Sequence, residues 1–122
     1  MNNANTQILR KVEDAQAFHF STGFNAFTGQ KANSLEEFLL RVREVDIRCL
    51  EFHLSQKDFE KWIEFTLGDI RLAADLRRLR EQKLVGENLR TLLSLLVSGR
   101  LKELKSTSLP KARKQSKSKT NI

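Results

Sequence analysis

The sequence predicts a mainly α-helical fold: a small single-domain bundle of four to five helices, with a short N-terminal extended or strand segment and a disordered basic C-terminal tail. The chain of 122 residues, 39% of them hydrophobic, is long enough for one modest core and too short for a second domain. Apolar residues recur at helical spacing through most of residues 35–104, and lysines follow them. We therefore expect an N-terminal arm with helical potential at 1–16, a helical domain at 17–104 and a tail at 105–122.

Residues 17–21 are predicted to form the strand. Phe18 and Phe20 flank His19 in strict alternation, which is the pattern of a half-buried strand. Because one strand alone is not stable, this segment must pair with another, with residues 24–28 as one candidate, or lie against the helices.

The first long helix is expected to begin after Ser34. Its side chain can cap the backbone N–H three residues further on while Glu37 reaches back, which is the S-x-x-E capping box. Asp46 is placed to start a second, shorter helix through Leu54. The first of these helices has an apolar face formed by Leu35, Phe38, Leu39, Val42 and Val45.

The stretch FHLSQKDFEKWIEFTLGD, residues 52–69, contains the start and stop signals of one packed helix. Ser55 is predicted as its N-cap and Asp58 as its third residue, where a negative charge faces the positive helix end. Gly68 has the position of a helix-ending glycine, and Asp69 that of the cap of the next helix. The expected buried face comprises Phe59, Trp62, Ile63, Thr66 and Leu67, with Glu60, Lys61 and Glu64 opposite in water.

Two further helices complete the predicted bundle. Residues 70–82 carry two apolar stripes, Gly86 interrupts the pattern, and residues 87–104 carry one apolar face. The remaining residues include the chain's single proline and no aromatic side chain. They cannot bury enough apolar surface to offset the entropy of ordering, so we expect them to be disordered.

Several of these residues together resemble a small prokaryotic, largely archaeal family of domains of unknown function. The shared pattern is FH-x4-DF-x2-WI-x4-GD-x2-LA, and the likeness extends over about residues 17–100. It implies the helical outline and a set of signature residues, but no activity that can be transferred. The signature residues are His53, Asp58, Phe59, Trp62, Gly68 and Asp69.

A metal site is one alternative function. Cys49 and His53 stand four residues apart, so they would present sulfur and nitrogen on one helix face. Two ligands do not make a site, and the simpler interpretation is a buried cysteine beside a hydrogen-bonded histidine. A complete site would need further ligands from His19, Glu51 or Asp58.

A catalytic site is a further alternative that the sequence does not favour. His53 and Asp58 could act as an imidazole and its orienting carboxylate, with Cys49 or Ser55 as the nucleophile. The sequence shows no glycine-rich oxyanion turn, and the stretch GFNAFTGQK lacks the spacing of a phosphate-binding loop. We therefore expect no enzyme activity and no cofactor, and a structural hydrogen bond between His53 and Asp58.

The strongest functional signal is the distribution of charge. Residues 101–122 contain seven basic residues and one acidic residue, a net charge of +6, whereas residues 1–100 carry only +1. Lysines interleaved with Ser, Thr and Gln suit contacts to phosphates without base reading, although a tail that only improves solubility would look the same. The predicted nucleic-acid-binding residues are Lys102, Lys105, Lys111, Arg113, Lys114, Lys117 and Lys119.

A second class of function is protein–protein interaction or oligomerisation. Leu40, Phe65 and Leu95 fall off the main apolar faces of their predicted helices, so they could meet another subunit or be covered by a two-sided core. The N-terminus lacks the apolar run of a signal peptide, and no stretch is long enough to span a membrane. We therefore expect a cytoplasmic protein without a membrane partner.

Overall fold

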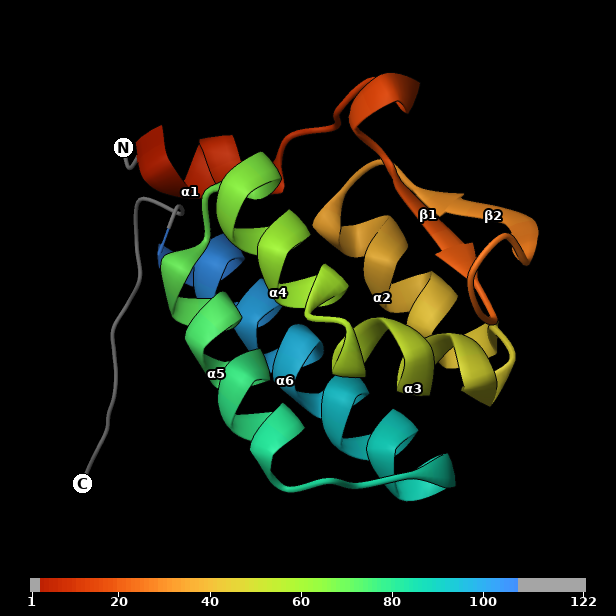
Figure 1. Ribbon diagram of the computed structural model, residues 1–122. Helices are drawn as coiled ribbons and strands as arrows, with labels where there is room; N and C mark the ends of the chain where they lie inside the picture. Colours follow the sequence, from red (N-terminus) through yellow and green to blue (C-terminus); the bar gives the residue numbers. More distant parts are fainter. Residues whose placement is uncertain (1–2, 108–122) are drawn as a thin grey trace.

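The computed structural model describes residues 3–107 and confirms the predicted class, a helical bundle with a short sheet near the N-terminus (Figure 1). Helix α1 lies in the N-terminal arm, and five helices follow the hairpin within the described residues. The elements in chain order are α1 (Asn3–Leu9), a 3-10 turn (Asp14–Gln16), β1 (Phe18–Ser21), β2 (Phe27–Ala32), α2 (Leu35–Glu44), α3 (Ile47–Ser55), α4 (Asp58–Lys61), a π-helical segment (Trp62–Leu67), α5 (Ile70–Glu81) and α6 (Gly86–Thr107).

Strands β1 and β2 form an antiparallel hairpin at one end of the molecule, beside α2 and α3 (Figure 1). The predicted strand at 17–21 corresponds to β1. Its partner β2 begins at Phe27, so it overlaps the candidate segment 24–28 only at the last two residues of that segment. Residues 22–26 form the turn, in which Thr22 N–H donates to the carbonyl of Ala26. The chain must reverse before it can pair, so the second strand starts only after this turn.

The helix-start signals of α2 and α3 act as predicted. Ser34 Oγ accepts a hydrogen bond from Glu37 N–H at 3.1 Å. Glu37 Oε1 in turn accepts from Asn33 N–H at 2.8 Å, one residue further back than in the usual capping box. Asp46 caps α3 by accepting from the N–H of Arg48.

The predicted start of the next helix is wrong. Ser55 is the last residue of α3, and its hydroxyl donates to the carbonyl of Phe52 instead of capping α4. Lys57 precedes α4 with a left-handed φ of 67°, and Asp58 is the first helical residue, not the third. Ser55 cannot cap α4 because the last turn of α3 extends to this residue. The left-handed Lys57 then changes the direction of the chain before α4.

The buried face of this segment is largely as predicted. Phe59, Ile63 and Leu67 are fully buried and Trp62 nearly so. Thr66, predicted on the same face, is only half-buried. Glu60 was expected in water, but it is buried and forms ion pairs with Arg77 and Arg80 of α5. A carboxylate can lie inside here because two guanidinium groups compensate it.

Helix α6 is the central packing element, since it contacts α1, α2, α3 and α5. Its described part reaches Thr107, beyond the predicted boundary between helix and tail after residue 104. Leu101 and Leu104 are buried, and their packing carries the helix past that boundary.

The core is rich in aromatic contacts between the hairpin and the helices. Phe18 of β1 lies 5.1 Å from Phe59 and 5.7 Å from Trp62, measured between ring centroids. Phe20 and Phe38 stack at 6.0 Å. These contacts link the short sheet, which would not be stable alone, to the bundle.

Phe59 and Phe65 offer a matched test of this core, because they lie in the same segment but are 0% and 77% exposed. We expect Phe59→Ala to lower the free energy of unfolding by about 3 to 5 kcal/mol, since it removes buried contacts and leaves a cavity. Phe65→Ala should change it by less than about 0.5 kcal/mol. Chemical denaturation of both variants measures the difference, and equal losses would contradict this packing.

Candidate functional site

His53 lies at the centre of the signature residues, on the last turn of α3. Its Nε2 is 2.9 Å from the backbone N–H of Ser21 in β1, and its Nδ1 is 2.8 Å from Oδ2 of Asp58 in α4. A backbone N–H can only donate, so Nε2 must accept and Nδ1 must carry the ring proton that is donated to Asp58. The predicted hydrogen bond between His53 and Asp58 is therefore present, with the tautomer fixed by the strand.

The surroundings of His53 favour its neutral form. The ring is buried among aromatic side chains, with the Phe18 ring centroid at 4.7 Å and that of Phe59 at 5.5 Å. Burial lowers the pKa of His53 below its usual value, although the hydrogen bond and the charge of Asp58 oppose that shift. A proton on Nε2 would also face the N–H of Ser21, so protonation would break this contact.

These contacts bear on the metal and catalytic alternatives. Both ring nitrogens of His53 are engaged, so neither offers a lone pair to a metal ion or to a substrate proton. Cys49 is fully buried, and burial raises the pKa of its thiol. Glu51 accepts from the N–H of Gly86 at 2.8 Å. Within residues 3–107, the His, Cys, Asp and Glu side chains form no group of three that could hold a metal ion.

Trp62 and Gly68 hold the ends of their segment. The indole N–H of Trp62 donates to the carbonyl of Gln16 at 2.8 Å, which fastens the N-terminal arm to the bundle. Gly68 has a φ of 87° and ends the π-helical segment, as predicted, and the N–H of the next residue donates to the carbonyl of Ile63. Both residues therefore have structural roles.

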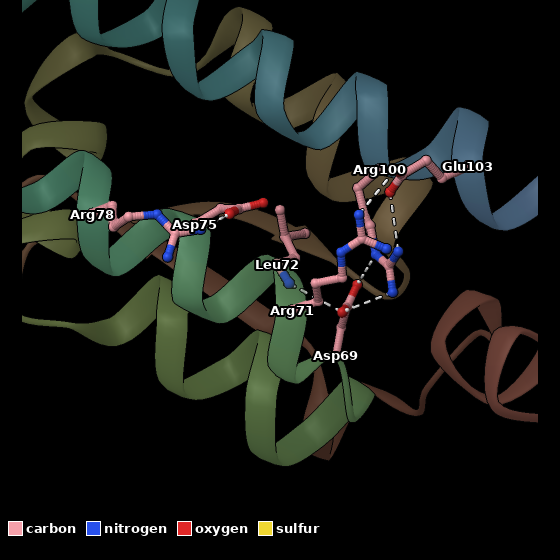
Figure 2. Close-up of polar contacts among 7 residues, drawn as sticks. All are labelled: Asp69, Arg71, Leu72, Asp75, Arg78, Arg100 and Glu103. Atoms are coloured by element: carbon pink, nitrogen blue, oxygen red, sulfur yellow. Dashed lines mark hydrogen bonds and ion pairs between the residues drawn. The ribbon is translucent and has the colours of Figure 1, made fainter.

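Asp69 combines two roles in one buried carboxylate (Figure 2). It caps α5, as predicted, by accepting from Leu72 N–H at 3.1 Å. It also pairs with Arg100 of α6, with Nε 2.8 Å from Oδ2 and Nη2 3.2 Å from Oδ1. Burial disfavours the charged form of Arg100, but its hydrogen bonds to Asp69 and Glu103 raise the pKa of Arg100 above its usual value. Asp69 thus joins the start of α5 to α6.

The base of the basic segment is attached firmly to the domain. Lys102 and Lys105 both lie on α6, although Lys105 was predicted to be the first residue of the tail. Lys105 forms an ion pair with Glu36 of α2, and Asn5 of α1 donates to the carbonyl of Leu104 at 3.1 Å. The other predicted nucleic-acid-binding residues lie outside the described residues: Lys111, Arg113, Lys114, Lys117 and Lys119.

The sequence interpretation missed the partners that these signature residues use. Arg100 stands three residues after Val97 and four before Leu104, so it falls on the apolar stripe of α6. A charged residue on such a stripe is a signal for a buried ion pair. Ser21 carried no such signal, because its contact with His53 uses only the backbone.

A family model described as a family of unknown function, DUF5752, matches residues 2–98. The chain belongs to this family. The match confirms a domain of unknown function. It begins at residue 2, in the N-terminal arm, whereas the predicted likeness began at about residue 17. The organism range and the sequence motif stay predictions. No curated protein and no solved structure matches the chain. Among residues 3–107, no helix is both long enough and apolar enough to cross a membrane.

The neutral His53 makes a prediction about pH. Its folded pKa lies below that of the unfolded chain, so unfolding takes up a proton as the pH falls through about 6.5. We expect the contribution of His53 to the free energy of unfolding to be fully present above that pH and to be lost below it. For this one group the loss is at most about 1.4 kcal/mol per pH unit. Urea unfolding between pH 7.5 and 5.5 measures the slope. His53→Gln should flatten it, and an equally steep slope in His53→Gln would contradict the assignment.

Asp69 and Asp75 provide a second matched pair (Figure 2). Asp69→Ala removes a cap and leaves the mostly buried Arg100 without its carboxylate, which should cost about 3 to 5 kcal/mol of unfolding free energy. Asp75→Ala removes a surface pair with Arg78 and should cost less than about 1 kcal/mol. Thermal and chemical denaturation compare the two, and a small effect at Asp69 would show that the buried pair is dispensable.

Proposed function

We propose that this DUF5752 member is a non-catalytic, cytoplasmic accessory module whose basic C-terminal segment binds nucleic acid, or a ribonucleoprotein, through phosphates and without sequence specificity. The observation that carries the proposal is the charge partition. Residues 108–122 contain five basic residues and no acidic residue, and they lie beyond the family match at 2–98. Such a segment is suited to polyanions.

The pairing of charges inside the domain supports this division. The arginines of α5 are held by carboxylates: Arg71 by Glu103, Arg78 by Asp75, and both Arg77 and Arg80 by Glu60. A guanidinium already paired in this way has less to gain from a phosphate. We therefore place the phosphate contacts on the C-terminal segment and not on α5.

The firm attachment of α6 adds a mechanical argument. Its last turns are joined to α1 through Asn5 and to α2 through Glu36. A nucleic acid bound by residues 108–122 would therefore be connected to the domain through a firmly attached helix. This contact would keep the domain close to the nucleic acid.

A protein–protein interaction or oligomerisation module, with a tail that only improves solubility, is the second proposal. Leu40, Phe65 and Leu95 are all exposed, as are Phe24, Ile70 and Val85. Large apolar side chains on the surface favour a partner, but these residues come from several different elements. The charge partition has no comparable role in this proposal, so we rank it second.

The salt dependence of binding tests the first proposal. The full chain is titrated with a short duplex and with a single strand, and the logarithm of the association constant is followed against that of the salt concentration. Five phosphate contacts predict a slope of roughly −4.5 on the duplex. The variant with Lys111, Arg113, Lys114, Lys117 and Lys119 all changed to Gln should lose most of this affinity and slope.

The control variant carries Arg71→Gln and Arg78→Gln, which remove two exposed but paired cations of α5. It should bind nearly as the wild type does. If the variant with five glutamines keeps its affinity at low salt, the nucleic-acid proposal is wrong and the interaction module takes its place.

A further inference from the structure

A pocket of about 310 Å³ lies between the hairpin turn and the junction of α3 and α4. Phe24 and Phe27 of the hairpin line it and are 78% and 74% exposed. Phe52 of α3 forms another part of the wall, and its ring meets that of Phe24 edge-on at 5.0 Å between centroids. Three aromatic rings therefore line an open hollow of the size that small groups occupy.

The pocket also contains an acceptor for a positive charge. Asp58 lines it with a side chain that is 38% exposed. Among the described residues, only Oδ2 of this carboxylate has a hydrogen-bond partner, which is His53. Within residues 3–107, no lysine or arginine forms an ion pair with Asp58. Since burial lowers the pKa of His53 and favours its neutral form, the imidazole does not neutralise this carboxylate. In the part of the chain that the structure describes, no lysine or arginine lines the pocket, and the titratable side chains there besides Asp58 are His19 and His53.

A second polar group in the wall lacks a partner. Ser21 is only 3% exposed, and its hydroxyl makes no hydrogen bond to any residue of the described part of the chain. Buried hydroxyl groups are normally satisfied, so an unpaired one in a pocket wall points to a group supplied from outside. The exposed Gln56 adds an amide at the rim.

We propose that this pocket binds an organic cation, an alkylammonium or guanidinium group, between the phenylalanine rings and the free oxygen of the Asp58 carboxylate. The faces of aromatic rings attract cations, and a nearby carboxylate strengthens the attraction. A phosphate or carboxylate ligand is disfavoured, because it would meet a negative charge and no lysine or arginine of residues 3–107 lines the wall. The pocket is therefore complementary in charge to the proposed nucleic-acid-binding segment, and it is independent of that proposal.

Two sources could supply this cation. One is a free small molecule, and the other is a lysine or arginine side chain of a polypeptide, including the basic residues at 108–122 of this chain. The chemistry recognised is the same in both cases. A competition experiment can separate the two.

The direct test uses matched pairs of probes on the full chain. Nα-acetylarginine amide is compared with Nα-acetylcitrulline amide, and choline with its neutral isostere 3,3-dimethyl-1-butanol, by following backbone amide signals of Ser21, Phe24 and Gln56. Each cation should bind about three- to tenfold more tightly than its neutral counterpart. Equal binding of cation and neutral isostere would overturn the proposal.

Substitutions assign the binding to the pocket. Asp58→Asn keeps an oxygen that can accept from His53 Nδ1–H but removes the charge, so it should weaken cation binding about three- to tenfold. The double variant Phe24→Ala, Phe27→Ala should weaken it similarly. Asp75→Asn and Phe65→Ala are the matched controls on other surfaces and should leave it unchanged.

Undiminished cation binding in folded Asp58→Asn or in the double phenylalanine variant would overturn the proposal. Should Asp58→Asn fail to fold, the comparison of each cation with its neutral isostere on the wild type still decides. The full chain with five tail glutamines identifies the source: tighter probe binding than in the wild type shows that the chain's own segment competes for the pocket. Unchanged binding supports a cation from another molecule.

Discussion

The hydrogen bonds of His53 tie the hairpin to the helices, because one neutral ring accepts from Ser21 of β1 and donates to Asp58 of α4 while it is itself part of α3. A two-stranded sheet has little stability alone, so β1 and β2 depend on this connection and on the aromatic contacts of Phe18. The same ring aligns the carboxylate that faces the pocket. Stability and any ligand binding at this end of the molecule therefore share one interaction.

A second group of interactions holds the opposite part of the bundle, and all of them are ionic. Glu60 joins α4 to α5, and Asp69 joins the start of α5 to Arg100 of α6 (Figure 2). Each buried carboxylate meets one or two guanidinium groups, which is the condition under which a charge can lie inside a protein. Many basic side chains of the domain are thus paired with its own carboxylates, whereas the residues after Thr107 include basic residues and no acidic residue.

Local signals allowed much of the fold to be predicted. The capping residues Ser34 and Asp46 and the left-handed Gly68 depend only on neighbours within a few positions, and all three act as expected. The prediction for Ser55 was wrong because this residue could belong to either of two helices, and packing decides between them. The prediction that Glu60 is exposed was wrong because its burial depends on arginines about twenty positions away. The pocket was not predictable at all, since tertiary folding brings residues 19–27 and 52–58 together.

The π-helical winding of Trp62–Leu67 has a consequence for the backbone. Each hydrogen-bonded ring of a π-helix holds one residue more than a ring of an α-helix, so the backbone hydrogen bonds change register within this segment. Ile63 and Leu67 are nevertheless buried and Phe65 is exposed, as regular helical spacing would place them. The wider winding therefore alters the hydrogen-bond ladder without changing which side chains face the core.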